Sequence, residues 1–559
     1  MKKMQLVKSS MALVLSSMLV LTACSKSGSD PTPSPSTSPS ALASSVPAKT
    51  PVTFTMNTLN ANLNWDNEIA AEITKRTGVS FKWDKVTTNE NEKLNLWLAA
   101  GDYPELLNLR DANMLKYIEA KALIDLTDLI EKHGPNIKKA YNNDLSLLKA
   151  ADGKIYGLRS NPSTKIENLA DQGWLYVQAA VLKDAGYPVL KTLDDVHNMV
   201  TAYAKKNPTI GGAKTIGYSN FGGDAQIHNI LDSPAIRYAG LPGTSIYHID
   251  DNNNARIRYF EPGYTDLYKF FQKVNQEGYF DPETITQSQE QFTTKCAQGR
   301  VLVVFGPSFA GGCTTDLVKN NMPERAYVAI DIVAPGKTRV NPAVTKATLN
   351  SNDYWAVVTK NAKDPVRVIQ FYDEMLKIEN QVLAAWGIEG KYYTVVNGKR
   401  TITPWFKAEM DKGGDAYERL GVAYSRPLLL NIQAGGILAD GDYARFGVSP
   451  SWINSSLQPS VKEALTSYKA TTFADLVVKG VTKDIPFTIT FFTDDVTKFN
   501  NEAIAEWKKA VAKFILEKDA SKLDAIWADF EKTLKGKGLD ANNKKVTELY
   551  AEYLKTLKK

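Results

Sequence analysis

The chain has 559 residues, and its 67 Lys and Arg against 61 Asp and Glu give a formal net charge of +6. So small a charge on so long a chain excludes any argument from charge for nucleic acid or an anionic membrane patch as the partner. Hydrophobic residues make up 43% and aromatic residues 10%, which is enough for large cores and for more than one domain.

The first residues predict export. Lys2, Lys3 and Lys8 form a basic start, and an apolar run from Met11 to Leu21 follows it. This run is too short to span a bilayer, so residues 1–23 are interpreted as a secretory signal. The tetrapeptide Leu21-Thr22-Ala23-Cys24 resembles a lipobox, in which the cysteine is lipidated and becomes the new N-terminus. A plain signal peptide with a chance cysteine is the alternative.

Residues 24–51 are predicted to be a tether. From Ser25 to Pro51 the chain is almost wholly Ser, Pro, Thr, Ala and Gly, with no aromatic residue, so it cannot build a core. Loss of residues 1–23 removes three lysines and no acid, which lowers the formal charge from +6 to +3. We therefore expect a lipid on Cys24, a flexible tether and then a globular body at a membrane surface.

The remaining cysteines and the histidines say little about chemistry. Cys296 and Cys313 permit one disulfide in an exported chain, and the residues leave open whether it forms. No metal site is expected, because the four histidines lack ligand spacing: His133, His197, His228 and His248.

The ordered part begins with alternating strand and helix patterns. Strands are expected at Val52–Met56, Val79–Trp83 and Leu106–Leu109, and helices at about Asp66–Arg76, Asn91–Ala100 and Leu115–Ala120. Such alternation predicts α/β units with mainly parallel sheets.

Further elements follow in the middle and at the end of the chain. The middle is expected to hold Trp174–Val181, a hairpin of Ser245–Ile249 and Ala255–Phe260, the strand Val301–Phe305 and a strand near Tyr354–Val358. The last 65 residues show helical spacing. Their aromatic residues, among them Phe499, Trp507 and Phe530, are interpreted as core residues that dock the helices.

Four motifs together resemble one family. They are the segments Lys93–Leu106 with Gly101-Asp102-Tyr103-Pro104, Asp152–Leu158, Gly278–Glu283 with the later Gly299-Arg300-Val301, and Gly387–Tyr393 with Asn397-Gly398. In this order and behind a lipobox, they resemble the extracellular solute-binding proteins of ABC importers, specifically the long lipoproteins of the family 1 sugar-binding type. The resemblance spans essentially the whole chain.

The resemblance implies an α/β, two-lobe periplasmic-binding-protein-like fold of type II, with discontinuous lobes and a ligand cleft between them. Crossing segments are expected near Ile155–Leu158 and Tyr354–Val358, with a third beyond residue 400. The first lobe then combines residues 52–157 with about 358–405, and the second combines about 158–357 with about 406–559.

The implied function is that of a membrane-tethered receptor of an ABC importer. It binds an oligosaccharide or glycan fragment, closes around it and delivers it to the permease, with no catalytic residue, cofactor or metal. We expect a monomer on the outer face of the cytoplasmic membrane, which is the periplasmic side in a cell with two membranes.

A sugar site needs aromatic faces for stacking and planar polar groups for hydrogen bonds. In open α/β sheets such residues follow the carboxyl ends of strands. The ligand-binding candidates are Asn60, Asn64, Trp65, Arg110, Asp111, Trp174, Tyr176, Gln178, Ser308, Phe309, Trp386, Glu389, Tyr393 and Trp452. Each has a structural alternative, such as a helix-capping role for Trp65, a surface ion pair for Arg110 and Asp111, and a core position for Trp174.

The sequence departs from the family in two places. Where several long members carry Arg-x-Asp-Trp, this chain has Gln178-Ala179-Ala180-Val181, which weakens any ligand inference from those relatives. Others carry a calcium loop ahead of an Ile-Gly strand. The corresponding stretch here is Asn207–Gly217, and no carboxylate lies between Asp195 and Asp224, so we predict no calcium there.

Three alternatives stay open. A receptor of the same build for a peptide or another polar solute is one. A secreted glycan-active enzyme is another, which would need an acid and a base in one cleft, for example Glu389 and Asp111. No nucleophile motif, metal-spaced His pair or nucleotide loop accompanies these acids. A purely structural surface protein is the third.

Overall fold

The computed structural model describes residues 50–557 except for 88, 151, 160–172, 224–225, 242–245, 307–309, 344–353, 426–435 and 485–492. The signal, Cys24 and nearly all of the tether therefore lie outside the described residues. Among the residues that are described, no helix combines the length and the apolar character that crossing a membrane requires.

The first sheet has five strands in the order β2-β1-β3-β14-β4. β1 runs parallel to both β2 and β3, whereas β14 is antiparallel to β3 and β4. The register pairs Met56 with Trp83, and Trp355 with Leu109. The strands are β1 (Val52–Thr58), β2 (Val79–Lys85), β3 (Leu106–Leu109), β14 (Trp355–Val358) and β4 (Gly157–Leu158).

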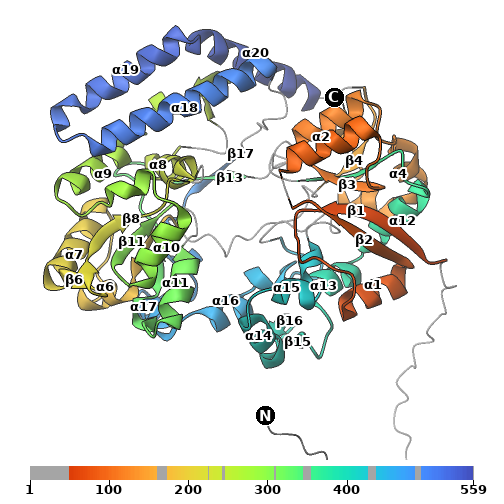
Figure 1. The fold of residues 1–559 in the computed structure, drawn as a ribbon, viewed down its shortest axis with the longest axis horizontal. Coiled ribbons are helices and arrows are strands. Elements are labelled where there is room, and N and C mark those ends of the chain that lie inside the picture. Colours follow the sequence, from red (N-terminus) through yellow and green to blue (C-terminus); the bar gives the residue numbers. More distant parts are fainter. Residues whose placement is uncertain are drawn as a thin grey trace, which may run out of the picture. The chain divides into compact units, whose positions relative to one another are not determined.

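Helices from both halves of the chain cover this sheet, and β1, β2 and α12 lie close together in Figure 1. α1 (Glu68–Thr77) begins after the cap Asn67, whose side chain accepts from the Ala70 amide. It ends at Gly78, where φ is 69°. The other elements around this core are α2 (Glu90–Ala100), α3 (Asp111–Glu119), α4 (Thr127–His133), α5 (Pro135–Ala140), α12 (Pro365–Met375), α13 (Ile378–Trp386), β15 (Tyr393–Val396), β16 (Lys399–Ile402), α14 (Pro404–Asp411), α15 (Ala416–Arg419) and α16 (Pro450–Ser456), beside α1 (Glu68–Thr77).

The first core extends beyond the boundary that the sequence analysis expects near residue 405. Phe406 packs against Tyr392 and Phe446, with ring centroids 5.2 and 4.9 Å apart. Asn67 donates through its side-chain Nδ2 to the Tyr424 hydroxyl at 2.7 Å, so the later segment also joins α1. Phe446 and Trp452 also pack with the first core, whereas the sequence analysis places residues from about 406 in the second lobe.

The second sheet has four strands in the order β12-β5-β11-β8. β11 is parallel to β8, and β5 is antiparallel to both of its neighbours, β11 and β12. The strands are β5 (Leu175–Gln178), β8 (Ile216–Ser219), β11 (Val301–Phe305) and β12 (Tyr327–Ile330). The helices that pack with it are α6 (Ala179–Asp184), α7 (Leu193–Lys206), α8 (Ser233–Ala239), α9 (Asp266–Gln276), α10 (Gln289–Ala297), α11 (Ala310–Lys319) and α17 (Pro459–Ser467).

Small ribbons accompany the second sheet. The expected hairpin forms, because β9 (Tyr247–Ile249) pairs antiparallel with β10 (Ala255–Ile257). β6 (Thr209–Ile210) and β7 (Ala213–Lys214) form another hairpin. β13 (Val340–Ala343) pairs in parallel with β17 (Val481–Asp484).

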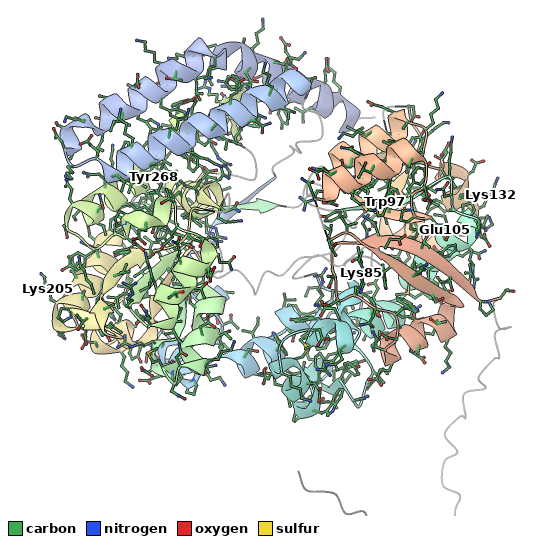
Figure 2. The ribbon with its side chains drawn as sticks, viewed as in Figure 1. Lys85, Trp97, Glu105, Lys132, Lys205 and Tyr268 are labelled. Carbon is green, nitrogen blue, oxygen red and sulfur yellow. A yellow bond between two sulfur atoms is a disulfide. The ribbon has the colours of Figure 1, made fainter. Side chains whose placement is uncertain are left out.

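Three C-terminal helices complete the second core, drawn in blue in Figure 1: α18 (Asp494–Leu516), α19 (Leu523–Gly536) and α20 (Leu539–Leu557). Tyr268 of α9, labelled in Figure 2, lies 5.8 Å from Trp527 and 6.4 Å from Phe514 between ring centroids. Trp507 and Phe530 are buried. The prediction that these aromatic residues are core residues is therefore confirmed.

A disulfide joins Cys296, near the end of α10, to Cys313 in the first turn of α11. Both cysteines are buried beside β11 in a small apolar cluster. The cross-link therefore connects two helices that flank the strand Val301–Phe305.

Candidate functional site

The carboxyl ends of β1, β2 and β3 meet at one edge of the first sheet, because these strands are parallel. β14 is antiparallel, so its amino end reaches the same edge. Lys85 of Figure 2 marks the end of β2 there. We call this region the first-sheet edge and define it by Asn60, Asn64, Trp65, Trp83, Glu90, Arg110 and Tyr354.

Aromatic rings cluster at this edge. Trp65 is half-buried, and its indole nitrogen donates to the Thr74 hydroxyl at 3.0 Å. Its ring centroid lies 6.2 Å from that of Trp83 and 4.9 Å from that of Tyr424. Trp83 is also half-buried, and its indole Nε1 has no hydrogen-bond partner among the described residues. The edge therefore offers indole rings held in place by their neighbours.

The two asparagines at this edge are already bonded within the protein. Asn60 donates through Nδ2 to Glu418 Oε1 at 2.6 Å. Asn64 Oδ1 accepts from the Asn67 side chain at 3.3 Å and from the Asp66 amide at 3.4 Å. In this structure both amides hold the loop after β1 in place.

Arg110 is an exposed cation of the edge. Its Nε donates to the Tyr354 hydroxyl at 3.0 Å, and its guanidinium carbon lies 4.9 Å from the centroid of that ring. Burial raises the pKa of the nearby Glu90 carboxyl, and the Arg110 charge and a hydrogen bond from Tyr354 counter that rise only in part. Asp111, expected in a loop, begins α3, and the structure does not describe its side chain.

The candidates on β5 and directly before it are core residues in this structure. Trp174 is 2% exposed and donates to the Ile332 carbonyl at 2.8 Å, and Tyr176 is 4% exposed. Gln178 is fully buried and donates to the carbonyls of Gly299 and Val301 at 2.9 and 2.8 Å.

The direction of β5 explains their placement. Because β5 is antiparallel to β11, Leu175 pairs with Phe305 at the carboxyl end of β11, and Gln178 lies at the opposite edge of the sheet. That Gln178 contacts the ligand stays a prediction, and in this structure its side chain bonds to carbonyls within the second core.

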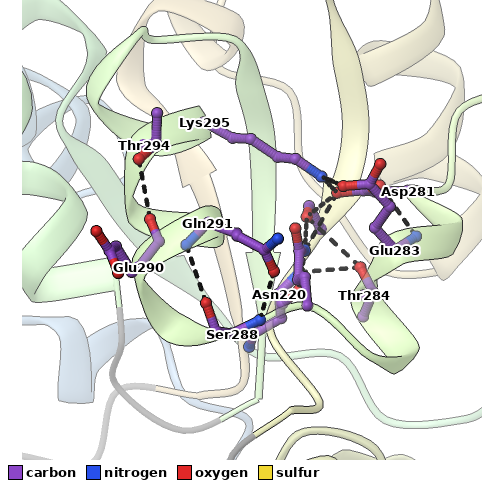
Figure 3. A network of polar contacts seen from close by, with 11 residues as sticks. Asn220, Asp281, Glu283, Thr284, Ser288, Glu290, Gln291, Thr294 and Lys295 are labelled. Atoms are coloured by element: carbon purple, nitrogen blue, oxygen red, sulfur yellow. Dashed lines mark hydrogen bonds and ion pairs between the residues drawn. The ribbon is translucent and has the colours of Figure 1, made fainter.

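A buried polar network supports the carboxyl edge of the second sheet (Figure 3). Asp281 Oδ2 accepts from the Ser219 hydroxyl and from Lys295 Nζ, each at 2.7 Å. Gln287 donates to the same oxygen at 3.2 Å, and the Asn220 amide donates to the Phe305 carbonyl. The candidates Ser308 and Phe309, which follow β11, lie outside the described residues.

The remaining candidates belong to the elements between α13 and α16. Trp386 is fully buried and donates to the Tyr443 carbonyl at 2.8 Å, and Tyr393 packs against its ring. Glu389 is exposed. Trp452 is half-buried, with its ring centroid 5.0 Å from that of Phe446.

One open hollow, of about 830 Å³, lies on α10 and includes Ser288, Glu290 and Thr294 of Figure 3. Serine, threonine, glutamine and asparagine residues line it together with Glu290 and Ala297. Within the described part of the chain, no three His, Cys, Asp or Glu side chains group as a metal site would require. The absence of calcium binding at Asn207–Gly217 stays a prediction.

Sequence reasoning missed Trp83, Glu90 and Tyr354. Trp83 was detectable, because it stands at the end of an expected strand. Tyr354 gave no such signal, because it precedes its strand. It reaches the edge because β14 runs antiparallel to β3.

Comparison with known proteins identifies related sequences and folds. FusA, the fructooligosaccharide ABC transporter substrate-binding protein of Streptococcus pneumoniae serotype 4, is 24% identical over 241 residues, which are 41% of this chain and 44% of FusA. The chain thus matches less than half the length of that relative. Lipoprotein LipO of Bacillus subtilis is 23% identical over 372 residues, 63% of this chain and 68% of LipO.

Solved structures share the fold. FusA of S. pneumoniae in complex with kestose superposes with a TM-score of 0.60 at 17% identity, covering 90% of this chain and 99% of FusA. A human-milk-oligosaccharide (HMO) binding solute-binding protein of Bifidobacterium longum infantis gives 0.60 at 16% identity, with 90% and 99% covered. The α/β fold is that of the two-lobe solute-binding proteins.

A family model described as bacterial extracellular solute-binding protein matches residues 68–410, which is more than half of the chain. The match includes β2, β3 and β14 of the first sheet and the whole second sheet. The chain belongs to the bacterial extracellular solute-binding protein family.

Proposed function

We propose that this protein is the tethered receptor of an ABC importer and binds an oligosaccharide or glycan fragment. Family membership supports the receptor role. The names of two relatives, a fructooligosaccharide receptor and an HMO-binding protein, favour a glycan as the solute. The observation that carries the proposal is the first-sheet edge, where one edge of a single sheet presents half-buried indole rings and an exposed guanidinium.

Sugar chemistry fits this edge. The apolar face of a pyranose or furanose ring stacks on an indole, and its hydroxyls bond to planar polar groups. Trp65 and Trp83 supply the rings, and Arg110 and Tyr354 supply donors and an acceptor. We assign ligand contact to these four residues and keep Ser308 and Phe309 as candidates from the other sheet.

The remaining candidates receive narrower roles. Trp174, Tyr176, Gln178 and Trp386 support the two cores, because they are buried in this structure. Glu389, Tyr393 and Trp452 stay secondary candidates. Asn60 and Asn64 shape the loop that carries Trp65.

The receptor acts by capture and release, without covalent chemistry. We take the two lobes to follow the two cores, with residues 52–159 and 355–452 in the first, and residues 173–334 and 461–557 in the second. Closure of such lobes on ligand gives the permease a form to recognise. The lipid on Cys24 holds the receptor at the outer face of the cytoplasmic membrane.

A ligand screen tests the proposal. The exported chain from residue 24, carrying Cys24→Ser to omit the lipid, is heated with neutral, uronate and deoxy-sugar oligosaccharides and with peptides, and products are read by mass spectrometry. We expect a glycan to raise the melting temperature and to return unchanged. Cleavage of the glycan would make the protein an enzyme, and stabilisation by peptides alone would exclude the sugar.

A further inference from the structure

A late segment of the chain, residues 416–424, is bonded to the loop that carries Trp65. Asn67 Nδ2 donates to the Tyr424 hydroxyl at 2.7 Å, and this hydroxyl donates to the Asn64 carbonyl. We call Asn64, Asn67 and Tyr424 the edge clamp. Because Asn64 and Asn67 lie on either side of Trp65 in the sequence, the edge clamp restricts the backbone from which the indole projects.

The edge clamp requires the close approach of a glycine. Gly421 is buried and has a φ of 75°, which glycine adopts without strain. A Cβ at this position would collide with the Asn67 side chain and would lie 2.8 Å from Ile69 Cβ. The late segment therefore reaches Asn67 only because position 421 carries no side chain.

Tyr424 acts on the site from inside the protein. Its ring centroid lies 4.9 Å from that of Trp65, and the residue is fully buried. In this structure it therefore offers no surface to a ligand. Any effect of Tyr424 on ligand binding passes through the residues that it touches, and Trp65 is the half-buried indole among them.

A second bond determines how Trp65 can contact a sugar. Its indole Nε1 donates to the Thr74 hydroxyl at 3.0 Å, so this N–H is already used within the protein. Trp65 then offers a ligand the face of its ring, and stacking on a ring face depends on how the ring is oriented. A residue that orients this ring therefore controls the contact.

We propose that Asn67 and Tyr424 are positioning residues of the ligand site, which hold the Trp65 ring in the orientation that stacks a sugar. The inference rests on the proposed function and extends it to residues that do not touch the sugar. A ring that is oriented before binding has less side-chain freedom to lose when the ligand arrives, so its orientation adds to affinity. The edge clamp thereby couples the late segment to the strength of glycan binding.

The test removes the Tyr424 hydroxyl and keeps the ring. The exported chain carrying Cys24→Ser is titrated calorimetrically with neutral, uronate and deoxy-sugar tetrasaccharides, with and without Tyr424→Phe. We expect the affinity for the glycan that binds to fall about fivefold, which is the size of effect that loss of a buried hydroxyl bond produces. Gly421→Ala, which displaces Asn67, should weaken binding in the same way.

Tyr117→Phe is the matched control. Tyr117 is also a buried tyrosine of the first core, and its hydroxyl donates to the Leu94 carbonyl at 2.8 Å. Its ring packs against that of Tyr103, outside the edge clamp. This variant should lose a similar amount of stability in urea and keep the glycan affinity of the wild type.

A double-mutant cycle separates positioning from a purely structural role. In a chain that already carries Trp65→Ala, Tyr424→Phe should lower affinity less than about twofold, because the ring that it orients is gone. An unchanged affinity in Tyr424→Phe, an equal loss with and without Trp65, or full affinity in Trp65→Ala alone overturns the inference and leaves the receptor function standing. No binding of any of these glycans by the wild type overturns both.

Discussion

Trp83 of β2 lies nearly parallel to Tyr424, with ring centroids 6.5 Å apart and ring planes 15° apart. Trp83 stacks on Phe81 as well, at 5.4 Å and 18°. A residue from beyond position 420 thus completes an aromatic cluster that begins on the second strand of the chain. The candidate sugar-stacking rings therefore depend on residues from two distant parts of the sequence that meet in the first core.

Replacement of Trp83 by alanine should weaken glycan binding at least tenfold, because a stacking face is lost. Trp405→Ala is the matched control, since Trp405 is also a tryptophan of the first-core region and is 39% exposed. Titration calorimetry measures the dissociation constants, and urea unfolding shows that the variant is folded. Equal affinity of both variants would remove Trp83 from the site.

Gln178→Ala should lower the free energy of unfolding by about 2 kcal/mol or more, because the carbonyls of Gly299 and Val301 lose a buried donor. Asn252→Ala, an exposed amide in the β9–β10 turn, should stay within about 0.5 kcal/mol of wild type. Urea denaturation measures both. We expect the glycan affinity of folded Gln178→Ala to match wild type, and a selective loss of affinity at full stability would return Gln178 to the site.

Much of the local structure could be predicted from the sequence. The strands Leu106–Leu109 and Val301–Phe305 form over the expected residues, and the first helix was expected two residues early. Apolar runs and glycines at helix ends are signals carried by residues close together in the sequence. They therefore predict a strand or helix without knowledge of the tertiary fold.

Sheet direction and long-range packing could not be predicted in this way. An isolated apolar strand such as Leu175–Gln178 carries no mark of whether it runs parallel or antiparallel to its neighbours. The packing of Phe406 and Tyr424 into the first core likewise depends on contacts far apart in the chain. The edge formed by Arg110 and Tyr354 exists only once β14 is inserted between β3 and β4.

Asp232 should make the second core acid-sensitive. Its complete burial alone would raise the pKa, but the Arg258 charge and hydrogen bonds from His228 and Tyr264 lower it to about 2. A carboxyl pKa below its unfolded value of 3.8 stabilises the fold above that pH. The contribution, about 2 kcal/mol, is lost as pH falls from about 4 through 2.

Asp232→Asn tests this pH dependence. The variant should be about 3 kcal/mol less stable than wild type near pH 7, because the buried ion pair between Asp232 and Arg258 is lost. The difference should shrink as pH falls toward 2. Asp266→Asn, at an exposed aspartate, is the control. A stability difference that does not change with pH would show that Asp232 carries no charge in the folded protein.

The disulfide between Cys296 and Cys313 closes a short loop, with a sequence separation of 17 residues. Loop-closure entropy assigns such a cross-link about 3 kcal/mol of stability. The paired variant Cys296→Ser with Cys313→Ser should therefore unfold at lower urea concentration than the oxidised wild type. Reduction of the wild type should lower its stability by a similar amount. A midpoint of urea unfolding that a reductant does not change would contradict a formed bond.

The most direct measurement is a crystal structure of the exported chain, carrying Cys24→Ser, grown with the glycan that stabilises it most. The account predicts a sugar ring stacked on Trp65 or Trp83, with its hydroxyls bonded to the terminal nitrogens of Arg110. A glycan bound only in the hollow on α10, or one that contacts neither indole nor Arg110, would contradict the proposed site.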